Sequence, residues 1–87
     1  MAEEKYLELI RIFEDALREL GIEKKFSLDS NLREDLGLDS LTCMEVVQYV
    51  EENVGVRISN EAYNNLKTVK DLCDYIIKEE SRLVKEA

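Results

Sequence analysis

The chain has 87 residues, of which 45% are hydrophobic and 37% are charged, and its formal net charge is −8. This length fits one small domain over residues 1–87, and the composition is too apolar for a disordered chain and too charged for a membrane protein. The excess of acids argues against nucleic acids and anionic lipid surfaces as partners, and it favours basic protein surfaces.

The compartment is predicted from what the sequence lacks. No apolar run approaches the roughly 20 residues that span a bilayer, so we expect no membrane span. The start, Met-Ala-Glu-Glu-Lys, has neither the basic residues nor the apolar stretch of a signal peptide, which predicts a cytoplasmic protein. Cys43 and Cys73 are then expected to be reduced and half-buried. With no histidine and no CxxC pair, we expect no metal site.

Residues 4–20 form the first predicted helix, followed by a long loop. The helix has apolar side chains at helical spacing: Tyr6, Leu9, Ile10, Phe13, Ala16, Leu17 and Leu20. Gly21 then suits a helix C-cap. Residues 22–38 show no sustained period, and their apolar side chains are expected to anchor the loop to the core. These anchors are Ile22, Phe26, Leu28, Leu32, Leu36 and Leu38.

Residues 40–54 form the second predicted helix, which Gly55 ends. Its inward positions are Cys43, Val46, Val47, Val50 and Val54. Leu41, Met44 and Gln48 fall outside this stripe, and no lysine or arginine occurs between Arg33 and Arg57. An acidic helix face is usually just solvated, but this one lies next to a serine, so it is also a candidate docking surface.

Two further helices complete the predicted fold. Ser59 is expected to cap a short helix that carries Ala62, Tyr63 and Leu66. Thr68-Val-Lys-Asp71 has the pattern of a capping box and opens the last helix, with Val69, Leu72, Cys73, Ile76 and Ile77 facing inward. Residues 79–87 either continue this helix or fray. The fold class is therefore all-α, a small four-helix bundle with three main helices, one short helix and a long first loop.

Ser40 is the candidate for chemistry, and three interpretations are open. Asp39 and Ser40 are both preferred cap residues, so the pair could simply start the helix. Catalysis by Ser40 is not supported, because the chain has no histidine as a base and no G-x-S-x-G elbow, which predicts a protein that is not an enzyme. The third interpretation is a modification site, because an exposed hydroxyl at a helix N-terminus tolerates an attached phosphodiester.

The segment Leu36-Gly37-Leu38-Asp39-Ser40-Leu41, followed by the helix with Glu45, resembles the phosphopantetheine attachment motif of acyl carrier proteins. The similarity runs from about Leu32 to Ile77. It implies that Ser40 receives a 4′-phosphopantetheine arm from coenzyme A, through a phosphopantetheinyl transferase with magnesium. The arm's thiol then carries acyl groups as thioesters for fatty-acid, lipid or polyketide biosynthesis.

The resemblance also implies partners and two sets of residues. The partners are the transferase and the enzymes that load and transfer acyl groups through basic docking surfaces, and the carrier is expected to be a monomer. The implied docking residues are Asp39, Leu41, Met44, Glu45, Glu51 and Glu52. The implied acyl-pocket residues are Cys43, Val47, Leu66, Val69 and Leu72.

Two departures from the family pattern favour a specialised member. Thr42 stands where fatty-acid carriers typically have an acid, and Gln48 replaces an apolar residue. Two alternatives stay open on sequence alone. One is an aminoacyl or peptidyl carrier that uses the same serine. The other, from a different class, is an unmodified acidic helical adaptor.

Overall fold

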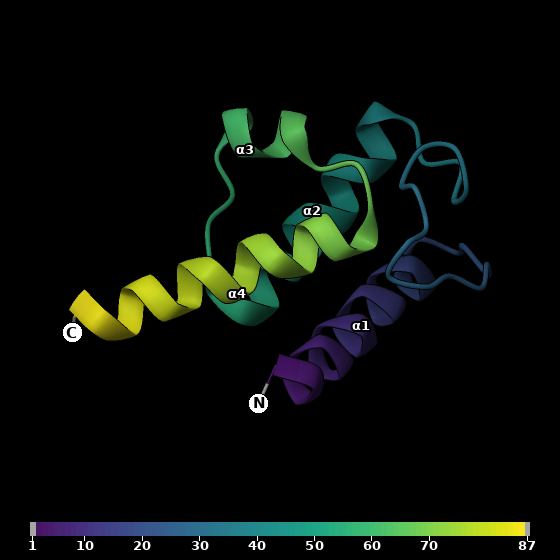
Figure 1. Ribbon diagram of the computed structural model, residues 1–87. Coiled ribbons are helices and arrows are strands. Elements are labelled where there is room, and N and C mark those ends of the chain that lie inside the picture. Colours follow the sequence, from purple (N-terminus) through teal and green to yellow (C-terminus); the bar gives the residue numbers. More distant parts are fainter. Residues whose placement is uncertain (1, 87) are drawn as a thin grey trace.

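The computed structural model describes residues 2–86, with side chains over residues 4–82, and within this range the chain folds into four helices (Figure 1). They are α1 (Ala2–Glu19), α2 (Ser40–Val54), α3 (Asn60–Asn65) and α4 (Val69–Glu86). The predicted all-α bundle is confirmed, with three long helices and one short helix. The predicted tail continues α4 as far as Glu86, and Ala87 lies outside the described residues.

Helix α1 packs against both α2 and α4. Figure 1 shows α1 and α4 running in opposite directions, so that the start of α1 lies beside the middle of α4. Two polar contacts join them there. The Tyr6 hydroxyl donates a hydrogen bond to the Asp74 carboxylate, and Lys5 Nζ lies 3.0 Å from Glu80 Oε2. These contacts fix the two terminal helices side by side.

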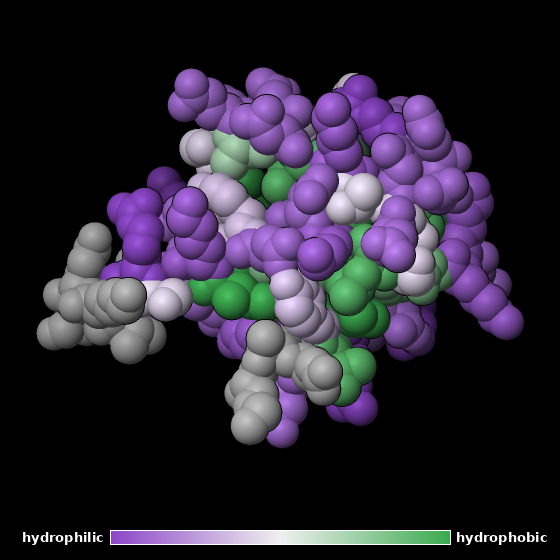
Figure 2. Space-filling view, viewed as in Figure 1, coloured by the Kyte–Doolittle hydropathy of each residue, from purple (hydrophilic) through white to green (hydrophobic). Residues whose placement is uncertain are grey.

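The core contains apolar side chains from the three long helices and from the loops. Its buried members are Leu9, Phe13, Ala16, Leu17, Leu32, Leu36, Leu38, Cys43, Val46, Val47, Val50, Val56, Val69, Leu72, Cys73 and Ile76. Both cysteines are free and fully buried, more than the half-burial that we predicted. Figure 2 shows one face of the molecule, where hydrophilic side chains cover most of the surface and hydrophobic ones appear in patches between the helices.

The end of α1 differs from the prediction at one residue. Leu20 was expected on the inward stripe but is 38% exposed, because the helix ends at Glu19 and the chain turns at Gly21, where φ is +75°. The Ile22 amide donates to the Leu17 carbonyl and the Gly21 amide to the Arg18 carbonyl, a Schellman arrangement that needs a left-handed residue.

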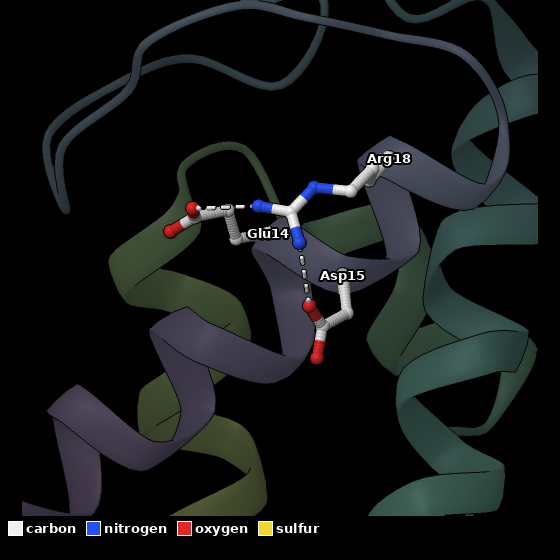
Figure 3. Close-up of polar contacts among 3 residues, drawn as sticks. All are labelled: Glu14, Asp15 and Arg18. Carbon is white, nitrogen blue, oxygen red and sulfur yellow. Dashed lines mark hydrogen bonds and ion pairs between the residues drawn. The ribbon is translucent and has the colours of Figure 1, made fainter.

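On the solvent side of the same helix, Arg18 forms ion pairs with Glu14 at 3.3 Å and with Asp15 at 3.5 Å (Figure 3). All three side chains are exposed, so each pair contributes only about 0.3–0.5 kcal/mol. The stability of α1 therefore comes mainly from its buried face.

The long loop, residues 20–39, is tied to the start of α4. The amides of Val69 and Lys70 donate to the carbonyls of Ser30 and Leu28, at 3.1 and 2.8 Å, and the Leu32 amide donates to the Lys67 carbonyl at 2.8 Å. The predicted capping box is also present, because the Asp71 amide donates to Thr68 Oγ1 and the Thr68 amide donates to Asp71 Oδ2. The loop therefore approaches α2 from a fixed position.

No helix within the described residues is both long and apolar enough to cross a membrane.

Candidate functional site

Ser40 is the first residue of α2, and its side chain is exposed. The chain reaches it through an anchored segment, in which Leu36 and Leu38 are buried on either side of Gly37. Gly37 has a φ of +66°, which a residue with a side chain rarely adopts. The buried leucines and the left-handed glycine together direct the chain outward, so that the helix begins with Ser40 at the surface.

Asp39 is the N-cap of α2. Its backbone is extended, with φ −78° and ψ 177°, and its Oδ1 accepts a hydrogen bond from the Thr42 amide at 2.7 Å. This backbone N–H lowers the pKa of the Asp39 carboxyl. Among the described residues none is hydrogen-bonded to Ser40 Oγ. The capping role that the sequence left open between the two residues therefore belongs to Asp39, and the serine hydroxyl is available.

Tyr63 of α3 makes a contact with the site that the sequence did not predict. Its hydroxyl donates a hydrogen bond to the main-chain carbonyl of Ser40 at 3.3 Å. Burial raises the pKa of Tyr63, as does the neighbouring Cys43, while Arg33 opposes the shift. The sequence pattern placed Tyr63 on the predicted short helix, but such a pattern carries no information about a partner 23 residues away.

The six predicted docking residues lie in two different situations. Leu41 and Met44 are 68% and 53% exposed, and the side chains of Glu45 and Glu52 are also exposed. Asp39 is exposed but caps the helix. Glu51 is half-buried, and its Oε2 accepts a hydrogen bond from the Ile58 amide at 3.1 Å. The structure thus places Leu41, Met44 and Glu45 together in the open beside Ser40.

Two cavities lie along α2. The larger, which we call the α2–α3 groove, has a volume of about 950 Å³ and lies between α2, the 55–58 link, α3 and α4. Its lining residues include Met44, Val47, Ile58, Tyr63 and Tyr75. The smaller, the loop cavity, has a volume of about 400 Å³ and lies between the long loop, α2 and α3. Its lining residues include Arg33, Cys43, Tyr63, Asn64 and Leu66.

The predicted acyl-pocket residues are divided among these places. Val47 lines the α2–α3 groove, and Cys43 with Leu66 lines the loop cavity. Val69 and Leu72 are buried in the core and line neither of the two cavities. The five residues therefore do not share one open space in this structure.

Comparison with known proteins agrees with this geometry. The family model for the phosphopantetheine attachment site matches residues 8–76. The acyl carrier protein of Syntrophobacter fumaroxidans is 36% identical over 79% of this chain and 86% of its own length. That of Treponema denticola is 44% identical over 62% of this chain and 69% of its own length. The crystal structure of an acyl carrier protein from Thermotoga maritima superposes with a TM-score of 0.81 at 28% identity, covering 91% of this chain and 94% of that one.

The fold and these matches define a domain that carries a phosphopantetheine group. The chain belongs to the phosphopantetheine-attachment family and, within it, groups with the acyl carrier proteins. Such a protein holds acyl groups as thioesters on a covalently attached 4′-phosphopantetheine arm, and the family consists of carriers, not catalysts. The resemblance noted in the sequence is confirmed, and the comparisons support it over the peptidyl-carrier and adaptor alternatives.

Proposed function

We propose that Ser40 Oγ is the atom to which the 4′-phosphopantetheine arm is attached. The observation that carries this proposal is the division of tasks at the start of α2, where Asp39 caps the helix and the neighbouring serine hydroxyl is exposed. The site fits the group chemically, because the positive end of a 15-residue helix stabilises a phosphodiester attached at its first residue.

The attachment step requires a second protein. Ser40 Oγ attacks the phosphorus next to the pantetheine of coenzyme A, a new O–P bond forms, and the P–O bond to the adenosine bisphosphate breaks and releases it. The hydroxyl proton must pass to a base, and the chain has no histidine to receive it. The transferase, with its magnesium ion, supplies the base and neutralises the leaving phosphate.

Leu41, Met44 and Glu45 form the recognition surface for the transferase and for the acyl-handling enzymes. Their exposure beside Ser40 supports this role, since apolar and acidic side chains suit a partner with a basic rim and an apolar pocket. Glu52 extends the acidic surface along the helix. Asp39 and Glu51 add negative charge, although both carboxylates also accept hydrogen bonds from backbone amides.

The partners act in fatty-acid, lipid or polyketide biosynthesis in the cytoplasm, with the carrier as a monomer. The first turn of α2 contains no acid, because Thr42 takes a position where fatty-acid carriers typically have one. This feature favours a specialised set of partner enzymes. Of the predicted pocket residues, Cys43, Val47 and Leu66 border the two cavities, whereas Val69 and Leu72 meet cargo only if the core opens.

The test is intact mass spectrometry after incubation with coenzyme A, Mg²⁺ and a promiscuous transferase. The wild-type chain should gain one phosphopantetheine, and Ser40→Ala should gain none. Ser59→Ala is the matched control, because it removes a different exposed serine, the N-cap of α3, and should still be modified. An unmodified wild-type chain, or a modified Ser40→Ala variant, would refute the assignment.

A further inference from the structure

Tyr63 lies where the two cavities and the attachment site meet. Among the described residues it is the only one that lines both the α2–α3 groove and the loop cavity. Its side chain packs against the hydrophobic core, and its hydroxyl reaches the main-chain carbonyl of Ser40 at 3.3 Å. The ring therefore extends from the core to the residue that we propose as the root of the arm.

Three residues on one face of α2 show that the ring of Tyr63 stands between the loop cavity and the α2–α3 groove. Ser40, Cys43 and Val47 follow one another at spacings of three and four, so they lie along one face of the helix. Cys43 opens onto the loop cavity and Val47 onto the groove, and Tyr63 contributes to the wall of each. An acyl chain that runs from Ser40 along this face toward Val47 meets the ring first.

The backbone of α3 holds the ring in this place. The Tyr63 amide donates to the Ser59 carbonyl at 2.8 Å, and the Leu66 amide donates to the Tyr63 carbonyl at 3.1 Å. Ser59 Oγ caps the same turn by accepting from the Ala62 amide. To admit a chain between the two cavities, the side chain must turn away and give up its bond to Ser40.

We propose that Tyr63 determines cargo specificity by closing the passage from Ser40 into the helical interior. The inference rests on the proposed attachment at Ser40. With the ring in place the domain shelters short acyl groups, and the outer part of a long apolar chain stays in solvent or passes to a partner enzyme. With a smaller residue at position 63 the two cavities join, and a long chain is sheltered.

The experiment uses acylated full-length chains. Acetyl, butyryl, octanoyl and palmitoyl coenzyme A are loaded with a promiscuous transferase onto wild type, Tyr63→Ala, Tyr63→Phe and Tyr75→Ala. Intact mass verifies each product. A folded wild-type chain that accepts no group contradicts the attachment at Ser40, whereas the variants that load test the role of Tyr63. Two quantities are then measured, the rate of thioester cleavage by neutral hydroxylamine and the shift in Tm relative to the unacylated holo form.

In wild type we expect octanoyl and butyryl thioesters to be cleaved at similar rates. In Tyr63→Ala the octanoyl thioester should be cleaved about tenfold more slowly, roughly the effect of burying two methylene groups, and its Tm should rise. Tyr63→Phe should match wild type, because the ring remains. Tyr75→Ala should also match it, because this ring lines the same groove from α4 without the bond to Ser40.

Three results would overturn the proposal. The first is equal protection of the octanoyl thioester in wild type and Tyr63→Ala. The second is a Tyr63→Phe variant that protects the octanoyl thioester as strongly as Tyr63→Ala does. The third is a Tyr75→Ala variant that protects it as strongly as Tyr63→Ala does. If Tyr63→Ala is unfolded by circular dichroism, Tyr63→Leu replaces it. Leucine keeps an apolar contact with the core but does not reach Ser40. In Tyr63→Leu the octanoyl thioester should therefore again be protected relative to wild type. Equal cleavage rates in Tyr63→Leu and wild type would overturn the proposal.

Discussion

At the scale of single residues, the site depends on two neighbours with different tasks. Asp39 has an extended backbone and accepts the Thr42 amide, and Ser40 is already helical. Both residue types are common helix caps, so the sequence cannot tell which of them caps. The backbone conformation shows that Asp39 is the cap, and the serine hydroxyl is left exposed, as the proposed modification requires.

This division predicts unequal stability effects at the two positions. Asp39→Ala should lower the Tm by about 5 °C, the shift expected from losing a helix cap in a domain of this size. Ser40→Ala should change it little, because alanine is a good helix former and the Ser40 side chain holds no cap. Thermal unfolding by circular dichroism measures both. Equal losses in the two variants would contradict the assignment of the cap to Asp39.

The pH dependence of the same cap has a definite sign. The Thr42 amide lowers the pKa of Asp39 in the folded state, so the folded chain binds this proton less tightly than the unfolded chain does. The stabilisation is therefore present above the ordinary carboxyl pKa near 4 and is lost as the pH falls through the lowered value. The Tm difference between wild type and Asp39→Asn should shrink on acidification, whereas Asp29→Asn, at an exposed loop position, should follow wild type.

At the scale of elements, α2 presents one face to the core and another to solvent, and we propose the solvent face as the docking surface. Glu45→Lys should slow modification at Ser40 by about threefold to tenfold, because a charge at the edge of an interface acts mainly on the association rate. The Tm should hardly change, since Glu45 is exposed. The measurement is the initial rate of mass gain at low salt.

The matched control for this substitution is Glu19→Lys. It makes the same charge change at an exposed position on a different helix, at the end of α1. It should leave the rate close to wild type. A rate that falls equally in both variants would mean that net charge, and not the start of α2, governs recognition.

The sequence predicted the elements well because each depends on local information. The spacing of apolar residues located the four helices and most of their buried positions, and Thr68 with Asp71 marked the start of α4. It did not predict the bonds that join distant segments. The tie between Tyr63 and Ser40, and the Glu51 carboxylate bound to the Ile58 amide, depend on how the helices pack. The sequence therefore predicted Ser40 as the candidate site, but it did not predict the contacts that α3 and the 55–58 link make with α2.

At the scale of the whole molecule, charge is the dominant feature. Twenty acids stand against 12 bases, and no base occurs among residues 34–56, the segment that contains α2. The radius of gyration is 12.3 Å. Because the Debye length is about 30 Å at roughly 0.01 M salt, almost every charge then interacts with every other. At roughly 0.1 M it falls to about 10 Å, and repulsion across the molecule is largely screened.

Salt should therefore raise the Tm, even though it also weakens exposed ion pairs such as Arg18–Glu14. Exposed pairs contribute little, so the relief of repulsion in a chain of net charge −8 outweighs their loss. Thermal unfolding at neutral pH, from about 10 to about 300 mM NaCl, should show a steady rise, with Mg²⁺ effective at lower concentration. The double variant Glu45→Gln/Glu52→Gln should show a smaller rise, because it removes two charges from the acidic face of α2. A flat or falling Tm in wild type would contradict this account of its stability.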